Sequence, residues 1–275
     1  MLAAALIVFR EVLEAGLIVG IVLAATEGIR GRGWWIAGGV LGGVLGASIV
    51  AVFAQRLSEI FQGGGQNVFN AAILVAAVAM LGWHTIWMSR HARELASGMK
   101  ILGGAVASGE RTLLAMAVVV AIAILREGSE VVLFLFGIAA SGGEQPLSMI
   151  AGGVAGVLAG ATCSWLLYRG LLAIPTRRLF STTNGLVALL AAGMAGQAAV
   201  LLARANLLPS LGDEVWDTSG MLRDDGILGR ALHAMVGYSD RPMGIQLISY
   251  FGVLAILVFL GRWFGQQRRA TLVSS

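Results

Sequence analysis

Seven long apolar segments alternate with short charged connections along the chain, and this pattern restricts its fold more than any other feature. A helix needs about 20 mostly apolar residues to cross the hydrocarbon core of a bilayer. The runs are continuous rather than alternating, which predicts helices and not the strands of a membrane barrel. We therefore expect an all-α, multi-pass membrane protein with seven transmembrane helices, at residues 2–25, 34–54, 68–88, 113–138, 148–170, 180–203 and 244–264.

The composition agrees with this class and excludes others. Hydrophobic residues make up 57% of the 275 residues and charged residues 12%, whereas a soluble domain has roughly twice that charged fraction. A pI near 10.0 would suit nucleic-acid binding, but the basic residues are scattered between apolar segments. We therefore expect a lipid bilayer and no nucleic acid as the partner of these residues.

The basic residues of the connections predict the orientation, because cytoplasmic loops carry an excess of Lys and Arg. With the N-terminus outside, the inner side holds twelve of the 19 Lys and Arg residues and the outer side holds five. The last outer connection also carries six acidic residues, and positions 227–237 within it have the spacing of a short surface helix. The pattern indicates an N-out, C-in topology.

The two halves of the chain are similar in sequence. "FREVLE" (9–14) matches "LREGSE" (125–130), and "GGVLGGVLGA" (38–47) matches "GGVAGVLAGA" (152–161). The glycine rows fit close helix packing. A unit of three spans inverts when it is repeated, and inverted repeats are a transporter architecture. We predict one integral membrane domain over 1–275, an inverted repeat of 3+3 helices plus a seventh: repeat one at about 1–110, repeat two at about 111–204, and the outer loop with helix seven at 205–275.

Charged residues interrupt the first and fourth apolar segments near their middles. Each ionised residue costs about 2.5–3.5 kcal/mol at the bilayer centre. Within each set the three residues share one helical face at about 100° per residue. Two arginines cannot neutralise four glutamates, so the six groups together carry a formal charge of −2, which a cation would balance. These residues are Arg10, Glu11 and Glu14 in the first segment and Arg126, Glu127 and Glu130 in the fourth.

Two other interpretations of these charges remain open. Each arginine could pair with the glutamate at i+4 and only lock helices together, or the glutamates could carry protons. Carboxylates suit hard cations such as Fe³⁺, Mn²⁺, Ca²⁺ and Mg²⁺. Residues that could contribute secondary contacts are His84 and Met80 on the third segment, Met194 on the sixth, and Asp213, Glu214 and Asp217 in the outer loop.

Two motifs carry a resemblance to a known family. "REVLE" and "REGSE" resemble the paired Arg-Glu-x-x-Glu motifs of the oxidase-dependent iron permease family, which contains bacterial relatives of the fungal high-affinity iron permeases. The block "EVWDTSGML" (214–222) and the segment 228–252 are similar to the C-terminal part of the same family. The resemblance covers nearly the whole chain. It departs from the family pattern at Val12, where the usual residue is glycine, as in Gly128 of the second motif.

The resemblance implies an iron ion transmembrane transporter of the plasma (inner) membrane, which moves iron into the cytoplasm. Iron would be a transported substrate, with no permanently bound cofactor. A separate external oxidase or a periplasmic iron-delivery protein would be the partner. The motif residues it implies as iron-binding groups are Glu11, Glu14, Glu127 and Glu130, with Arg10 and Arg126 as their electrostatic partners.

Three alternatives are weighed against this hypothesis. The nearest is a broader divalent-cation or cation/proton transporter, which competition by Mn²⁺ or Zn²⁺ would reveal. A remote one is an intramembrane metal-dependent enzyme, which usually needs spaced histidines on neighbouring helices. Beyond His84 the chain has only His91 and His233, which we place in connections, so we do not expect an enzyme. A non-transporting scaffold would not explain the duplicated buried charges.

Overall fold

The computed structural model is entirely helical over the residues it describes, which are 1–60, 65–141, 145–170, 176–224 and 226–273. Within these ranges there are eight helices and no strand: α1 (Leu2–Ala25), α2 (Arg32–Ile60), α3 (Gln66–Ala107), α4 (Leu113–Ala140), α5 (Pro146–Tyr168), α6 (Thr176–Arg204), α7 (Ile227–Val236) and α8 (Gly244–Val273). The all-α prediction is confirmed. Seven helices match the predicted apolar segments, and α7 matches the predicted surface helix.

Among the described residues, five helical stretches are long and apolar enough to cross a membrane, which makes the chain a multi-pass membrane protein. They are Arg32–Ile60, Gln66–His84, Pro146–Tyr168, Thr183–Arg204 and Gly244–Trp263. The helices α1 and α4 are of similar length, but each carries three charged residues near its middle. The two helices that are least suited to face lipid are therefore the two that carry the charged motifs.

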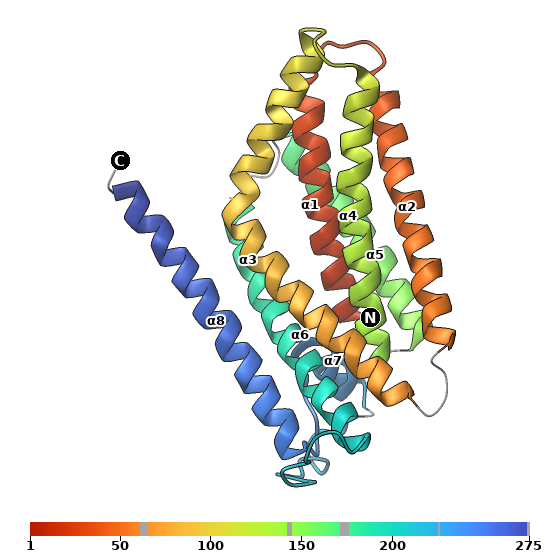
Figure 1. The fold of residues 1–275 in the computed structure, drawn as a ribbon, viewed down its shortest axis with the longest axis vertical. Coiled ribbons are helices and arrows are strands. Elements are labelled where there is room, and N and C mark those ends of the chain that lie inside the picture. Colours follow the sequence, from red (N-terminus) through yellow and green to blue (C-terminus); the bar gives the residue numbers. More distant parts are fainter. Residues whose placement is uncertain (61–64, 142–144, 171–175, 225, 274–275) are drawn as a thin grey trace.

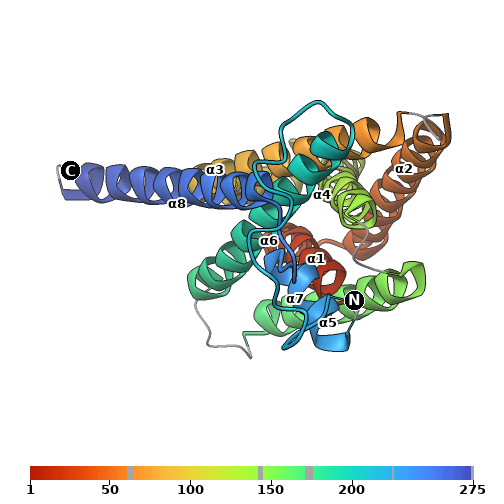
Figure 2. The same cartoon turned by 90° about the horizontal axis from the view of Figure 1, so that it is seen from below.

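These two helices lie at the centre of the bundle and are covered by partners from the other half of the chain. The helix α5 packs along α1, and α2 packs along α4, while α3 packs against α6 (Figures 1 and 2). A Cβ added at Gly43 would lie 2.7 Å from the carbonyl oxygen of Ala121 on α4, and one at Gly156 would lie 2.6 Å from that of Ala5 on α1. Glycine is required here because only its bare backbone allows such close approach, as the sequence predicted.

The helix α3 is far longer than its apolar segment. Its 42 residues correspond to about 63 Å at 1.5 Å per residue, twice the thickness of a bilayer core. The prediction that residues 89–112 form a connection is wrong for most of their length, since the helix ends at Ala107. The segment is charged but consists mainly of good helix formers without proline. His91 thus lies in α3 and His233 in α7, and neither lies in a connection.

Two apolar clusters flank the charged residues along the bundle. One contains Ile7 of α1, Leu74 of α3 and Phe134 of α4. The other contains Val22 of α1 and Val120 of α4, with residues of α2 and the distal part of α3. On both α1 and α4 the charged positions fall between these clusters in sequence, so the charges occupy a polar layer between two apolar ones.

The segment between α6 and α8 lies at the same end of the bundle as the start of α1. In Figure 1 this segment and α7 are at the bottom, whereas the C-terminal half of α8 rises away from the other helices. The helix α7 ends at Gly237, which has a φ of 69° and packs directly on Gly193 of α6. Glycine supplies the left-handed conformation that ends the helix and the space for this contact.

Candidate metal centre

Three helices bring seven polar groups into the middle of the bundle. The helix α1 contributes Arg10, Glu11 and Glu14, α3 contributes His84, and α4 contributes Arg126, Glu127 and Glu130. All of them except Arg126 are buried. Such burial is expensive for ionised groups unless partners compensate each charge. The pairing of every oxygen and nitrogen therefore decides what the site can hold.

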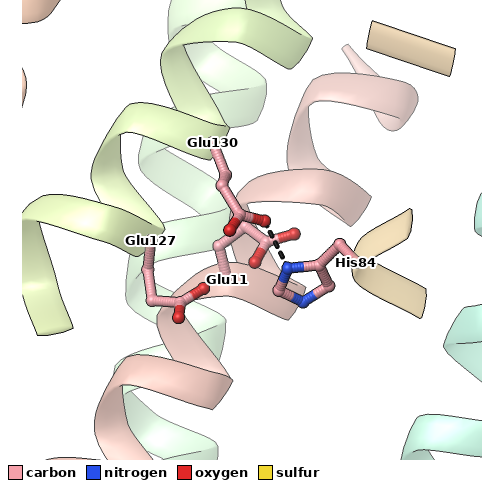
Figure 3. Close-up of side chains that lie close together, drawn as sticks. All are labelled: Glu11, His84, Glu127 and Glu130. Atoms are coloured by element: carbon pink, nitrogen blue, oxygen red, sulfur yellow. Dashed lines mark ion pairs between the residues drawn. The ribbon is translucent and has the colours of Figure 1, made fainter. Parts of the chain in front are cut away.

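Four of these residues form a compact group of possible metal ligands. Glu11, His84, Glu127 and Glu130 each offer one ligand atom, and these atoms all lie within 4.8 Å of one another. Figure 3 shows the four side chains converging from three helices. Two oxygen ligands on opposite sides of one first-row transition metal lie about 4–4.5 Å apart. The observed spread is thus close to what a single ion requires. Among the described residues this is the one such group of His, Cys, Asp and Glu.

The arginines neutralise only part of the acidic charge. Arg10 Nη1 lies 3.0 Å from Glu11 Oε1, and Arg10 Nη2 lies 3.1 Å from Glu14 Oε1. Arg126 Nε lies 3.2 Å from Glu130 Oε1 and 3.8 Å from Glu127 Oε1. The i, i+4 pairs that structural locking requires are therefore present in both motifs.

Two carboxylates of the group nevertheless keep one oxygen free. The Oε2 atoms of Glu11 and Glu127 are buried and have no hydrogen-bond partner within the described residues, whereas Oε2 of Glu130 lies against His84 Nδ1. Buried polar atoms are almost always paired, and two unpaired acceptors within one compact group of carboxylates are an arrangement that a bound cation would satisfy. Pairing with arginine alone therefore does not account for the site.

The imidazole of His84 connects the two motifs. Its Nε2 lies 3.1 Å from Glu14 Oε2 on α1, and its Nδ1 lies 2.5 Å from Glu130 Oε2 on α4 (dashed line in Figure 3). The sequence marked His84 only as a secondary contact and all four motif glutamates as ligands. In the structure His84 belongs to the compact group, and Glu14 lies outside it, on the other ring nitrogen.

The two methionines lie in apolar surroundings. Met194 is buried in the cluster around Ile7 and Phe134, and Met80 packs against the same cluster. The Met194 methyl group lies next to Gly137 of α4, where a Cβ would overlap it. Packing against aliphatic side chains gives these residues a complete structural role.

The acidic residues of the outer loop are separate from the buried group. Asp213, Glu214 and Asp217 are exposed, and Arg241 lies 3.1 Å from Asp217 and 3.8 Å from Glu214. Hydrogen bonds from Ser219 lower the pKa of the Asp217 carboxyl below its ordinary value. These contacts describe an exposed loop in which Glu214 and Asp217 already have Arg241 as a partner.

One neighbour of the site was not anticipated from the sequence. The guanidinium of Arg126 lies 4.5 Å from the ring centroid of Trp87, one turn beyond His84 on α3. Cations are attracted to the face of an indole ring. Only the i, i+3 spacing of His84 and Trp87 could have indicated that both face α4.

These features define the class of the molecule as a polytopic helical membrane protein with an acidic centre, made of groups that could hold a metal ion, enclosed among its helices. A sequence model of the iron permease FTR1 family matches residues 1–265. The chain therefore belongs to the iron permease FTR1 family. Membership of a permease family identifies it as a transporter and not an enzyme, with no cofactor indicated beyond its transported substrate.

Individual relatives give the same result. The chain is 29% identical over 267 residues to the ferrous iron permease EfeU of Yersinia pestis, with 92% of this chain and 91% of the relative covered. It is 26% identical over 250 residues to the ferrous iron permease EfeU of Escherichia coli O6:K15:H31, with 90% of both chains covered. No solved structure matches the chain.

Proposed function

We propose that this protein carries iron through the membrane into the cytoplasm and that Glu11, His84, Glu127 and Glu130 bind the ion during transit. The observation that carries this proposal is the convergence of these four groups within 4.8 Å, with the Oε2 atoms of Glu11 and Glu127 left unpaired among the described residues. The names of the relatives, which are ferrous iron permeases, support iron as the substrate.

The chemistry of the donor set suits iron. Three carboxylates and one imidazole combine hard oxygen donors with a borderline nitrogen donor, and this combination binds both ferrous and ferric ions. With Glu14 and the two arginines included, the formal charge of the site is −2 when His84 is neutral. A divalent ion would neutralise it fully, so the empty and loaded states differ strongly in electrostatic energy.

Glu14 is proposed as the residue that orients His84. Metal-binding histidines usually donate their second ring N–H to a carboxylate, which fixes the tautomer and makes the ligand more basic. The 3.1 Å contact between His84 Nε2 and Glu14 Oε2 has this form. A proton on Nε2 leaves the lone pair of Nδ1 directed toward the carboxylates of α4. Arg10 in turn holds Glu14 through its second oxygen.

The architecture that we propose around the site is an inverted repeat of three plus three spans with a seventh span, N-out and C-in. In this topology α1 and α4 cross the membrane as well, shielded from lipid by the helices packed on them. The exchange of partners between halves, α2 with α4 and α5 with α1, supports a repeat. The position of the α6–α8 segment at the N-terminal end of the bundle supports the topology (Figure 1). The membrane is the plasma (inner) membrane.

The supply of iron is proposed to involve a second protein. An external oxidase or a periplasmic delivery protein would present iron at the outer end of the bundle. The exposed residues Asp213, Glu214 and Asp217 lie at that end and would attract cations at long range. Met80 and Met194, which are packed among aliphatic residues, would shape the wall and make no bond to iron.

Iron uptake into proteoliposomes tests the proposal directly. Ferrous iron held reduced and ferric iron held as a soluble chelate are offered separately to the wild type and to the double variant Glu11→Gln plus Glu127→Gln. Amides keep the size of the side chains but bind metals poorly, so we expect the uptake rate and the equilibrium affinity for iron to fall by more than about tenfold. The preferred oxidation state of the wild type shows whether oxidation precedes entry.

Glu59→Gln is the matched control, because Glu59 is a glutamate at the exposed end of α2 that contacts Gln55 and Arg56 of its own helix and lies outside the buried group. It should transport at the wild-type rate. Normal uptake by a folded Glu11→Gln plus Glu127→Gln variant would show that the buried carboxylates are structural. Equal competition by Mn²⁺ and Zn²⁺ against the wild type would instead support a broader divalent-cation transporter.

A further inference from the structure

A cavity lies beyond the acidic centre, at the opposite end of the bundle from the α6–α8 segment. It has a volume of about 630 Å³ and opens between α1, α3 and α5. On α1 it is lined by Gly16, Leu17, Gly20 and Ile21, which directly follow Glu14 in sequence. It is therefore a candidate for the part of the pathway that connects the centre with the surface.

The face of α1 that lines the cavity continues the face that carries the motif. Arg10, Glu14, Leu17 and Ile21 follow one another at steps of four, three and four residues, so they form one row along the helix. Residues Gly16 to Ala25 cover about 14 Å at 1.5 Å per residue. A single row thus runs from the acidic centre, past the side chain of Leu17, into the cavity.

Three helix C-termini surround the open end of the cavity. Its lining includes the last turns of three helices: Ala24 and Ala25 end α1, Gly104 lies in the last turn of α3, and Tyr168 ends α5. The C-terminus of a helix carries the equivalent of about −0.5 charge and exposes carbonyl oxygens. Three such ends around one opening favour a cation, and Lys100 at the same opening is the single basic residue in the lining.

A buried hydroxyl provides an oxygen inside the cavity. Ser164 of α5 lines it and is 8% exposed, and its Oγ has no hydrogen-bond partner among the described residues. It lies against Gly16, where any Cβ would overlap it. A serine oxygen with free lone pairs, one helical turn from the level of Glu14, is suited to an ion that has left the carboxylates or to its hydration water.

We infer that this α1–α3–α5 cavity is the inner vestibule through which a hydrated metal cation leaves the acidic centre, with Leu17 as the apolar step between them and Ser164 as a transient oxygen contact. The inference rests on the proposed function, since it extends the path of the same ion.

The test fills the cavity without touching the centre. A Cβ at Gly20 would have Tyr168 Cδ2 as its nearest neighbour at 3.8 Å, so a side chain enters there without a backbone clash. We expect Gly20→Leu to lower the rate of iron uptake into proteoliposomes by about tenfold or more and to leave equilibrium iron binding in detergent unchanged. Gly38→Leu is the control, because Gly38 on α2 is exposed and has nothing within 4 Å of an added Cβ.

The possible results separate this inference from the proposed function. If Gly20→Leu takes up iron at the wild-type rate while Glu11→Gln plus Glu127→Gln does not, the vestibule is overturned and the metal centre stands. Wild-type uptake by the glutamate variant would overturn the metal centre itself. Slow uptake with intact binding in Gly20→Leu, against normal uptake in Gly38→Leu, supports the vestibule.

A chemical version of the test is independent of whether the leucine variant folds. Cys163 is the only cysteine, so Gly20→Cys in a Cys163→Ala background carries a single thiol inside the cavity. We expect a small, membrane-impermeant cationic thiol reagent to react from the cytoplasmic side and to reduce uptake about tenfold. A cavity filled by lipid would exclude this reagent and admit only apolar ones, which would overturn the inference, as would unchanged uptake after complete labelling.

Discussion

The two Arg-Glu-x-x-Glu motifs have the same sequence pattern but different surroundings. In the first, Arg10 is 1% exposed and bonds to both glutamates of its own motif, at 3.0 and 3.1 Å. In the second, Arg126 is 39% exposed, bonds to Glu130 at 3.2 Å and leaves Glu127 at 3.8 Å. Its guanidinium lies over the ring of Trp87 instead of being enclosed by carboxylates.

This difference teaches that duplication of a motif does not duplicate its role. Arg10 is a fixed internal counter-ion for α1, because it has no route to solvent. Arg126 is partly exposed and is held by one close ion pair with Glu130, a longer one with Glu127 and an aromatic ring, so it can move away from its glutamates at lower cost than Arg10. The second motif is therefore the adaptable half of the centre, and substitutions in the two halves should have different effects.

Loss of Arg10 should have the largest effect on stability. Removal of one partner from a buried ion pair leaves an uncompensated charge and costs about 3–5 kcal/mol. We expect Arg10→Leu to unfold at much lower denaturant or temperature than the wild type in detergent, or to fail to accumulate. The measurement is the free energy of unfolding in mixed micelles.

Arg126→Leu is the matched comparison for that variant. Because Arg126 is more than one third exposed, water and salt screen its ion pair, and the cost should be about 1 kcal/mol or less. Equal destabilisation by the two substitutions would contradict the distinction between a fixed and an adaptable motif.

The glycine contacts should come next in magnitude, and here the two halves should behave alike. Gly43→Ala places a Cβ 2.7 Å from the Ala121 carbonyl oxygen, and Gly156→Ala places one 2.6 Å from that of Ala5. Both force helices apart, and overpacking of this kind costs about 1–3 kcal/mol. We expect similar losses in the free energy of unfolding for the two variants.

Gly153→Ala is the control for the glycine pair, since Gly153 has nothing within 4 Å of an added Cβ. It should be neutral or slightly stabilising, because alanine favours a helix over glycine by about 0.8–1 kcal/mol. If only Gly43→Ala lost free energy of unfolding, the α2–α4 contact and the α5–α1 contact would not be equally close.

Replacement of Trp87 should affect the second motif only. A cation–π contact is worth about 0.5–2 kcal/mol depending on its exposure, so Trp87→Leu should lower stability modestly while it frees Arg126 to approach Glu127 and Glu130. A freed arginine would compete with the metal ion, and we expect iron affinity to fall. Titration of iron into the detergent-solubilised variant measures this fall.

The same titration on Trp83→Leu serves as the control for Trp87→Leu. Trp83 is a neighbouring tryptophan of α3 that is 69% exposed at the outside of the bundle, so its replacement should leave iron affinity unchanged. If both variants lost affinity equally, the effect would come from α3 as a whole and not from the contact with Arg126.

The sequence predicted the helical class and the buried motifs because both depend on local patterns. Apolar length predicts spanning helices, and charges that are costly in lipid indicate a site. The continuation of α3 to Ala107 was missed, since hydropathy marks where a helix leaves lipid and not where it ends. The central position of His84 was underestimated, because the pairing of α3 with α1 and α4 is a tertiary contact with no sequence signal.

The space beside the first motif at Val12 is set by tertiary structure. The family pattern has glycine at this position, as in Gly128, and valine suggested less space beside the first motif. In the structure the space comes from the partner helix: Gly160 of α5 lies against Val12, whereas Gly128 lies against Ala47 of α2. A small residue of the partner helix therefore lies against this position in each motif, so both helix pairs pack closely.

The smallest expected effect concerns a pair of acidic residues in the loop outside the membrane. Water screens this pair more strongly than the buried carboxylates of the centre. Asp224 and Asp240 exchange backbone hydrogen bonds, in which the Asp240 amide donates to Asp224 Oδ1 at 3.1 Å. Burial, together with the nearby charge of Asp240, raises the pKa of the Asp224 carboxyl above its ordinary value of 3.8. A carboxyl with a raised pKa stabilises the folded loop at low pH, and this contribution is lost as the pH rises through the raised value.

Asp224→Asn keeps the acceptor oxygen and removes the repulsion, so it should be equal to the wild type below pH 3.8 and more stable above the raised pKa. Because the side chain is only partly buried and water screens the pair, the gain should be about 0.5 kcal/mol or less. Hydrogen exchange of the Thr218 amide, which bonds to the Asp240 carbonyl at 2.9 Å, reports loop opening as a function of pH. A gain that is the same at every pH would mean that the benefit of the amide does not come from charge. A gain of several kcal/mol would mean that water screens this pair no better than it screens the carboxylates around His84.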